Sequence, residues 1–249
     1  MSRLFAFAVA AVTTIAGLGS LSLFILFLAA EGLDLVDFRM GPLVALAWDA
    51  LLCLVFFAQH SGMVRRPFRD LVSRVLPVPY YGAVYTVASA AALVLLSVCW
   101  QPSHVILAVL EGPAQWITRT LLLASLAGFL WGILALKDFD AFGVDGILSR
   151  ARGQPPRAAL LTIRGPYRWV RHPFYFSAIL ALWAAPVLSA DRLLLNAFFT
   201  VWIAVGTKLE ERDLVREFGQ TYSEYQRQVP MLLPWRRPAP ARRADGHFA

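Results

Sequence analysis

Charged residues are scarce in this chain of 249 residues. They make up 16% of it, whereas apolar residues make up 58%, and the mean hydropathy is +0.59. A typical soluble domain has about 25% charged and roughly 45–50% apolar residues. Because so few charges cannot cover a globular surface, the apolar excess requires a lipid environment. The composition excludes an ordinary soluble enzyme and a disordered protein.

Cysteine is also scarce, and several familiar motifs are missing. The two cysteines, Cys53 and Cys99, both lie inside apolar runs, which excludes a secreted module held together by disulfides. The sequence has no HExxH or CxxC motif, so we expect no metal site. It also has no P-loop and no GxGxxG after a strand, so neither a nucleoside triphosphate site nor a dinucleotide-binding domain is expected.

Six apolar runs approach the roughly 20 residues that a helix needs to cross a bilayer. They cover residues 4–30, 43–59, 82–100, 117–136, 174–190 and 193–209. The first run is longer than the core of a signal peptide, about 7–15 residues, so we interpret it as a retained span. Only Asp191 and Arg192 separate the last two runs, which predicts a tight helical hairpin. The predicted fold is all-α, an integral membrane bundle of about six transmembrane helices.

The basic residues predict the orientation of these spans. Of 23 lysines and arginines, 20 lie before the first span, in alternate loops or after the last span. Such residues favour the cytoplasmic side. We therefore expect a multi-pass protein of the inner cell membrane with both termini in the cytoplasm. The net charge of +7 flanks spans and does not cluster on a soluble domain, so nucleic acid is not an expected partner.

The organisation beyond the spans is simple. Residues 1–235 are expected to form one transmembrane domain, and residues 236–249 a disordered basic tail rich in proline, alanine and arginine. After the sixth run, apolar side chains recur at spacings of three and four, which predicts an amphipathic helix at the cytoplasmic face. These side chains are Leu214, Phe218, Tyr222, Tyr225 and Val229. The sequence leaves the oligomeric state open.

The strongest local motif is RGPYRWVRHPFY at residues 164–175. Pro166 suits the first turn of a helix, and on such a helix Arg164, Arg168 and Arg171 would share one cationic face. Pro173 should break or kink the chain where it enters the membrane. The competing interpretation is an arginine-rich, aromatic anchor at the membrane interface.

A pair of acids follows the sixth run. Glu210 and Glu211 lie at the mouth of a span, where buried carboxylates are costly and usually functional. Adjacent helical residues point about 100° apart, so both cannot face one ligand centrally. The competing interpretation is a charged cap that ends the span.

Two further polar residues lie within the second run or at its end. His60 is at the inner end, where a lone histidine is usually structural. Asp49 lies deeper, and we interpret this acid as a helix-pairing residue.

The last third of the chain resembles a known superfamily. It carries RHPFY at residues 171–175, EERDL at 210–214, FGQTYSEY at 218–225 and VP at 229–230. In this order and spacing, the motifs resemble the isoprenylcysteine carboxyl methyltransferase superfamily of integral membrane enzymes. Further elements, three of them nearer the front, are similar to bacterial methanethiol S-methyltransferases and NnrU-like membrane proteins. These elements are residues 59–63, 100–102, 138–143 and 231–234.

The resemblance implies S-adenosylmethionine as cofactor, bound at the cytoplasmic membrane face, and a small lipophilic thiol as substrate. An arginine fits the carboxylate of that cofactor and a glutamate its ammonium group, while aromatic rings fit the adenine or the sulfonium. The implied cofactor-binding residues are Tyr167, Arg168, Arg171, His172, Pro173, Tyr175, Glu210 and Glu211. His60, Arg171 and Glu211 are the candidates for catalysis, with His60 as base or thiolate stabiliser.

Other functions stay open at this point. The acceptor could be a prenylcysteine carboxylate or a phospholipid amine in place of a thiol. A sterol-reductase-like enzyme that binds NADPH is disfavoured, because such enzymes usually carry Asp-Glu or His-Asp where this chain has Glu-Glu. A non-catalytic, NnrU-like accessory protein is the alternative outside enzymes.

Overall fold

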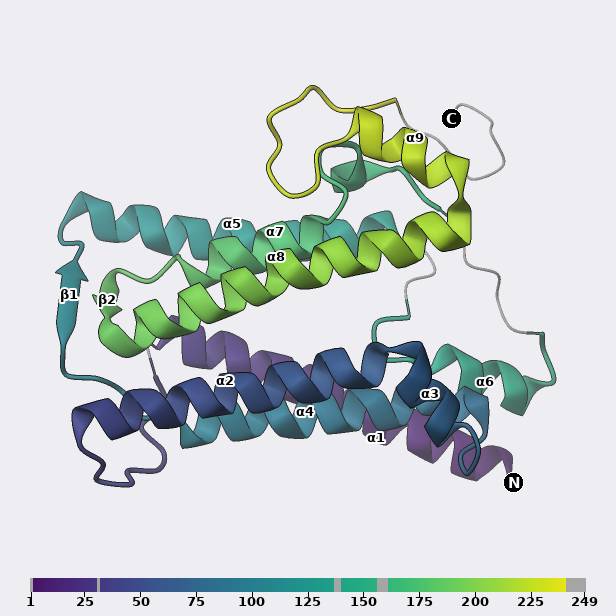
Figure 1. The fold of residues 1–249 in the computed structure, drawn as a ribbon, viewed down its shortest axis with the longest axis horizontal. Coiled ribbons are helices and arrows are strands. Elements are labelled where there is room, and N and C mark those ends of the chain that lie inside the picture. The colour runs from purple at the N-terminus through teal and green to yellow at the C-terminus, as the bar shows by residue number, and fades with distance from the viewer. Residues whose placement is uncertain (1, 31, 137–139, 156–160, 241–249) are drawn as a thin grey trace. The chain divides into compact units, whose positions relative to one another are not determined.

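A computed structural model describes residues 2–30, 32–136, 140–155 and 161–240 (Figure 1). Its elements are helices and one pair of short strands. In chain order they are α1 (Arg3–Ala29), α2 (Pro42–Val64), α3 (Arg66–Val72), η1 (Val78–Tyr80), α4 (Tyr81–Cys99), β1 (Ile106–Val109), α5 (Pro113–Ala135), α6 (Asp145–Arg152), η2 (Gly165–Arg168), α7 (Pro173–Leu182), β2 (Val187–Ser189), α8 (Ala190–Phe218) and α9 (Gln220–Gln228).

Five helical segments in the described part of the chain are long and apolar enough to cross a bilayer. They are α1, α2, η1 with α4 (Val78–Cys99), α5 and α8. The protein is therefore a multi-pass membrane protein, and the predicted all-α membrane bundle is confirmed. Segment 137–139 of the fourth loop, with part of the 138–143 motif, lies outside the described residues.

The fifth run differs from its prediction. Within residues 174–190 only the ten-residue helix α7 forms, which ends at Leu182 and is about 15 Å long. Pro186 disfavours a helical conformation at the residue before it, and strand β2 follows directly. The predicted turn at Asp191 and Arg192 is wrong, because these residues lie in the first turn of α8.

The sixth run continues past its predicted end at residue 209. Helix α8 extends to Phe218 and stops where Gly219 takes a left-handed φ of 57°, a conformation that side chains disfavour. Glu210 and Glu211 consequently lie inside a helix and do not cap its end. The apolar stripe predicted on one helix is divided between α8 and α9.

The chain divides into two compact units. Unit 1 comprises Met1–Leu107, Asp140–Arg157 and Ser189–Leu195, and unit 2 comprises Ala108–Phe139, Ala158–Leu188 and Asn196–Ala249. The paired strands β1 and β2 are where the chain passes between the units, because the boundaries at residues 107 and 188 fall inside them.

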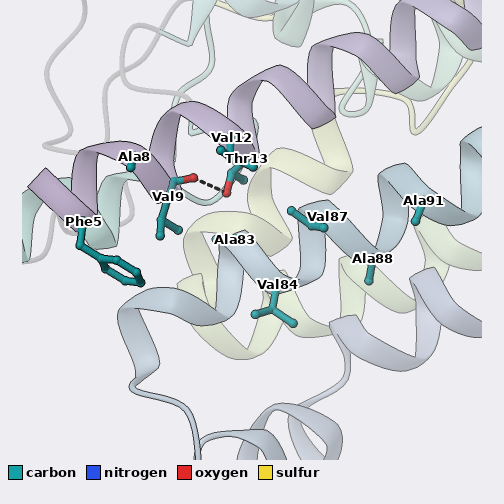
Figure 2. A pocket seen from close by; sticks show the side chains of 10 residues that line it. All are labelled: Phe5, Ala8, Val9, Val12, Thr13, Ala83, Val84, Val87, Ala88 and Ala91. Carbon is teal, nitrogen blue, oxygen red and sulfur yellow. Dashed lines mark hydrogen bonds between the residues drawn. The ribbon is translucent and has the colours of Figure 1, made fainter. Parts of the chain in front are cut away.

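In unit 1, glycines let the turn before α6 approach α1 and α4 closely. A Cβ added at Gly17 would lie 2.3 Å from the Phe142 ring, and one added at Gly82 would lie 2.5 Å from the Gly143 carbonyl oxygen. Ile147 of α6 is completely buried in a cluster with Ala6 and other residues of α1 and α4. Helices α1 and α4 also border an apolar groove of about 540 Å³ (Figure 2).

Two buried aspartates of unit 1, Asp49 and Asp191, accept hydrogen bonds from the segment that follows α4. Asp49 is completely buried and its Oδ1 accepts a 2.9 Å hydrogen bond from the Gln101 backbone N–H, which ties α2 to the end of α4. Asp191 accepts hydrogen bonds from the Trp100 indole N–H (2.9 Å) and from the Ser103 N–H (3.1 Å). These contacts support the interpretation of Asp49 as a helix-pairing residue.

Unit 2 packs α7 against α5. A Cβ at Gly128 would lie 2.5 Å from the Ser177 hydroxyl oxygen, and one at Gly132 would lie 2.6 Å from the Phe174 ring. A second cluster joins the end of the chain to the segment before η2. Its buried members are Ile163, Tyr222, Tyr225, Val229 and Ala239. Ala239 falls within the tail expected to be disordered, and residues 241–249 of that tail lie outside the described residues.

Candidate active site

The arginine-rich motif does not form the predicted α-helix. Residues 165–168 form the short 3₁₀ helix η2, and α7 begins only at Pro173. Gly165 has a φ of 52°, and an added Cβ would lie 3.1 Å from the Trp131 indole nitrogen, so this turn is specific to glycine. The predicted cationic face of Arg164, Arg168 and Arg171 is therefore wrong, because Arg164 and Arg171 flank η2.

Arg171 forms a two-pronged ion pair with Glu211 in unit 2. Its Nε donates to Oε1 at 2.5 Å and its Nη2 donates to Oε2 at 2.9 Å, and about a tenth of each side chain is exposed. The remaining nitrogen, Nη1, donates to the backbone carbonyls of Gln226 and Val229. All three guanidinium nitrogens of Arg171 thus hold α8 and the C-terminal end of α9 in place.

Glu211 also accepts hydrogen bonds from neutral side chains. The Gln226 amide donates to Oε2 at 3.0 Å, and the Tyr222 hydroxyl lies 3.5 Å from Oε1. Burial raises the pKa of the Tyr222 phenol well above its ordinary value, and the negative charge of Glu211 adds to this rise. Tyr222 consequently stays protonated and remains a donor to the carboxylate.

Glu210 faces a different group of residues. The Tyr175 hydroxyl donates to Glu210 Oε2 at 2.7 Å, and the Tyr175 ring stacks on His172 with centroids 5.4 Å apart. His172 Nε2 lies 3.2 Å from Glu211 Oε1 and its Nδ1 lies 3.9 Å from Glu210 Oε2, so the ring lies between the two carboxylates. The side chain of Glu210 is 43% exposed, against 10% for Glu211. The adjacent acids therefore have separate surroundings, as their 100° divergence predicts.

The remaining predicted residues border the same part of unit 2. The Tyr167 carbonyl accepts a 2.6 Å hydrogen bond from the Tyr225 hydroxyl, and the Tyr167 ring lies edge-on to Phe174 with centroids 6.2 Å apart. Burial raises the pKa of the Tyr167 phenol, and the negative charge of Glu210 raises it further. Arg168 Nε donates to the Ala239 carbonyl at 2.5 Å. Pro173 is buried at the start of α7.

A backbone strap, residues 229–240, completes the site. The N–H groups of Arg171 and His172 donate to the carbonyls of Pro230 (3.0 Å) and Met231 (3.2 Å). At the far end of the strap, the Ala239 N–H donates to the Arg168 carbonyl at 2.9 Å. Sequence reasoning missed the strap and Gln226. Backbone carbonyls leave no signal in a sequence, whereas Tyr222 and Tyr225 already stood out in the motif that contains them.

His60 belongs to unit 1. Its Nε2 lies 2.8 Å from the Tyr85 hydroxyl, so the pair joins α2 to α4, and its ring contacts Phe56 with centroids 5.3 Å apart. The structure thus brings eight of the nine predicted site residues together in unit 2. Among the residues that the structure describes, no three histidine, cysteine, aspartate or glutamate side chains are grouped so that they could hold a metal ion.

The sequence matches a family model described as NnrU protein over residues 50–235, three quarters of its length. The chain belongs to the NnrU family. The matched range includes both the 171–175 and the 210–214 motifs. No solved structure matches the chain.

Curated relatives of this NnrU-family chain fall into two groups by name. The methanethiol S-methyltransferase of Pseudomonas sp. (strain GM41(2012)) is 36% identical, over 84% of this chain and 82% of the relative. The methanethiol S-methyltransferase of Mycobacterium tuberculosis is 32% identical, over 77% of this chain and 79% of the relative. Nurim of Bos taurus is 30% identical, over 69% of each chain. The resemblance inferred from the motifs is confirmed.

Proposed function

We propose that this protein is a membrane methyltransferase that transfers a methyl group from S-adenosylmethionine to methanethiol and releases dimethyl sulfide. The observation that carries this proposal is the 36% identity to a methanethiol S-methyltransferase over more than four fifths of both chains. The arrangement of charge around Glu210 supports it. We further infer that the protein lies in the inner membrane with both termini in the cytoplasm.

The residues around Glu210 suit the cationic end of the cofactor. Its carboxylate is partly exposed and is oriented by the Tyr175 hydroxyl, so one oxygen can accept from an ammonium group. The stacked rings of Tyr175 and His172, with Tyr167 nearby in the chain, offer aromatic faces for the adenine or the sulfonium. We assign Glu210 to the ammonium group.

The ion pair of Arg171 changes which residue we assign to the carboxylate of the cofactor. Because the Arg171 guanidinium is already held by Glu211 and two carbonyls, we propose that Arg171 and Glu211 position the site and do not hold the cofactor. Arg168, which is half-buried beside the strap, is the cation that we assign to the cofactor carboxylate.

The bound cofactor supplies an electrophilic methyl group, and the protein must align donor and acceptor and exclude water. A thiol attacks well only as a thiolate, and an alkyl thiol has a pKa above about 8.5. We propose His60, held by Tyr85, as the proton acceptor. Replacing His60 with Gln is then expected to lower kcat while the affinity for S-adenosylmethionine stays unchanged.

The decisive experiment is turnover by the purified full-length protein in nanodiscs. Supplied with methyl-labelled S-adenosylmethionine and methanethiol, it is expected to release labelled dimethyl sulfide, detected by gas chromatography and mass spectrometry. Parallel reactions with a prenylcysteine and with phosphatidylethanolamine test the other acceptors. Release of labelled product only with one of those two acceptors would overturn the choice of a thiol. The variant Arg212→Gln, on the exposed side of α8, serves as the control with unchanged turnover.

A second candidate function is a membrane protein without turnover. The match to Nurim, whose name states no transferase activity, and the internal pairing of Arg171 with Glu211 favour it. Binding of labelled S-adenosylmethionine separates the two functions. Saturable binding supports the methyltransferase, and its absence in a folded preparation supports the second candidate.

A further inference from the structure

The segment between α2 and α4 must lie at a membrane surface. Helix α2 ends at Val64 and the next membrane-spanning segment begins at Val78. Because both helices cross the bilayer, the connecting residues 65–77 start and finish at the same face of the membrane. This connection is not an extended loop, since it contains the separate helix α3.

Helix α3 has two chemically different sides. At 100° per residue, Phe68, Leu71 and Val72 share one side, whereas Arg66, Arg69 and Asp70 share the other. No residue of α3 is buried, and 39% of Phe68 and 56% of Leu71 are exposed. An apolar side that the protein itself leaves uncovered suits a helix lying in the plane of a membrane interface.

Unit 1 gathers further positive charge at this same end. Helix α6 packs on the N-terminal part of α1 and on η1, through Ile147, Ala6 and Tyr80, so that α3, α6 and the start of α1 lie at one end of the unit (Figure 1). Six exposed arginines from these segments form what we call the basic collar. They are Arg3, Arg66, Arg69, Arg74, Arg150 and Arg152.

The acidic residues in this region do not neutralise the positive charge of the basic collar. Asp140 is engaged by α6, because its two carboxylate oxygens accept from the N–H groups of Val144 (2.9 Å) and Asp145 (2.8 Å). Asp145 lies in the first turn of α6, and Asp70 is the acid on α3. Within the described part of this region, six arginines against three acids leave this end of unit 1 positively charged.

We propose that α3 lies in the membrane interface with its apolar side among the acyl chains, and that the basic collar binds the phosphate groups of anionic phospholipids. The charge of the collar is complementary to such a surface, where each arginine contributes roughly a fivefold change in partitioning. The guanidinium of Arg69 lies 5.7 Å from the Tyr81 ring, at the junction where the chain re-enters the membrane. This inference holds whether or not the protein transfers methyl groups.

The depth of α3 can be measured directly. Spin labels are placed at Phe68→Cys or Asp70→Cys in a Cys53→Ala, Cys99→Ala background, and the full-length protein is reconstituted in nanodiscs. Collisions with oxygen are expected to dominate at position 68, and collisions with a water-soluble nickel chelate at position 70. Equal exposure of both labels to the nickel chelate would overturn the interfacial position.

The lipid preference is tested with phosphatidylglycerol titrated into phosphatidylcholine nanodiscs. Phosphatidylglycerol bound near α3 is followed through the label at position 68. Changing Arg66, Arg69 and Arg74 to Gln is expected to raise the half-saturating fraction of phosphatidylglycerol at least about fivefold. The matched control changes three exposed arginines of unit 2, Arg212, Arg216 and Arg227, to Gln. An equal effect of both triple variants, or none of the first, would overturn the assignment to the collar.

Discussion

At the scale of single residues, the two adjacent glutamates of α8 have different environments although their chemistry is the same. Glu211 is buried and meets Arg171, Gln226 and Tyr222, whereas Glu210 is partly exposed and meets Tyr175. A buried carboxylate that carries this many donors fixes structure, and a partly exposed one is able to bind a ligand. The pair of variants Glu211→Gln and Glu210→Gln separates these roles.

Glu211→Gln is expected to destabilise the fold, because it leaves the Arg171 guanidinium buried without a counter-charge. Removing one partner of a buried pair costs about 3–5 kcal/mol. Thermal unfolding in detergent checks the loss, and Glu210→Gln is the matched control with little expected change. An unfolding temperature of Glu211→Gln equal to that of the wild type would contradict the positioning role.

Glu210→Gln is expected to weaken the binding of S-adenosylmethionine. Losing one hydrogen bond to a charged group costs about 1.5–3 kcal/mol, which corresponds to roughly a 10- to 150-fold rise in Kd. Isothermal titration calorimetry on folded protein measures it. Tyr175→Phe removes only the hydroxyl that orients this carboxylate and is expected to have a smaller effect. Unchanged affinity in Glu210→Gln would remove Glu210 from the cofactor site.

Among the elements, α7 connects the arginine motif to the rest of unit 2. It packs against α5 where Gly128 and Gly132 leave room for Ser177 and Phe174. Since Tyr175 lies on the same short helix, the distance between α5 and α7 also governs where its hydroxyl meets Glu210. The glycines of α5 are thereby part of the site's geometry without touching its charges.

Gly132→Ala is expected to displace α7, because the new Cβ would lie 2.6 Å from the Phe174 ring. Such overpacking typically costs about 1–3 kcal/mol. Methyl transfer should fall and the unfolding temperature should drop. Gly206→Ala in α8 is the matched control, since nothing lies within 4 Å of its added Cβ. If both variants behave alike, close packing of α5 on α7 does not determine the site.

The sequence predicts the content of the site better than its contacts. The spacing of RHPFY and EERDL marks Arg171, Tyr175 and both glutamates, and the structure collects them in unit 2. The pairing of Arg171 with Glu211 depends on how η2 and α8 pack, and the spacing of motifs in a sequence carries no information about that packing. The helical face of Arg164, Arg168 and Arg171 failed because periodicity ignores the left-handed turn at Gly165.

The long spans were predictable for a simple reason: lipid requires continuous apolar helices, and hydropathy measures apolar length. Hydropathy misjudged residues 174–190, because it counts apolar side chains and takes no account of proline. Pro186 disfavours a helix at the residue before it and so prevents a full-length helix in that run. Hydropathy also missed α3, whose seven residues are too few to register as a span.

For the molecule as a whole, we expect residues 173–189 to complete a further crossing of the membrane without a full-length helix. Strand β2 pairs with β1, and β1 lies between α4 and α5, on the side of the bilayer opposite α3. The ten helical residues cover about 15 Å, and the next seven residues, which end in strand β2, are long enough at up to about 3.3 Å each to reach across the rest of the roughly 30 Å hydrocarbon core. Five long helices together with this composite segment predict an even number of crossings.

An even number of crossings predicts that both termini lie on the same side. Reporters of cytoplasmic and periplasmic location, fused in turn at Ala249 and before Met1, are expected to give the same cytoplasmic result. A third fusion at Glu111, between β1 and α5, is the internal control and should report the opposite side. Opposite results at the two termini would show that residues 173–189 do not complete a crossing.

The strap has a consequence for how the protein is made. Arg171 precedes Val229, whose carbonyl it binds, by 58 residues. At about 5–20 residues per second, the ribosome adds that length in about 3–12 s. During this interval the arginine has been synthesised but the strap carbonyl that will hold it has not, so the site can close only after the strap has been added. A truncated product that ends before residue 229 would carry the RHPFY, EERDL and FGQTYSEY motifs and still lack the strap that gives the site its final shape.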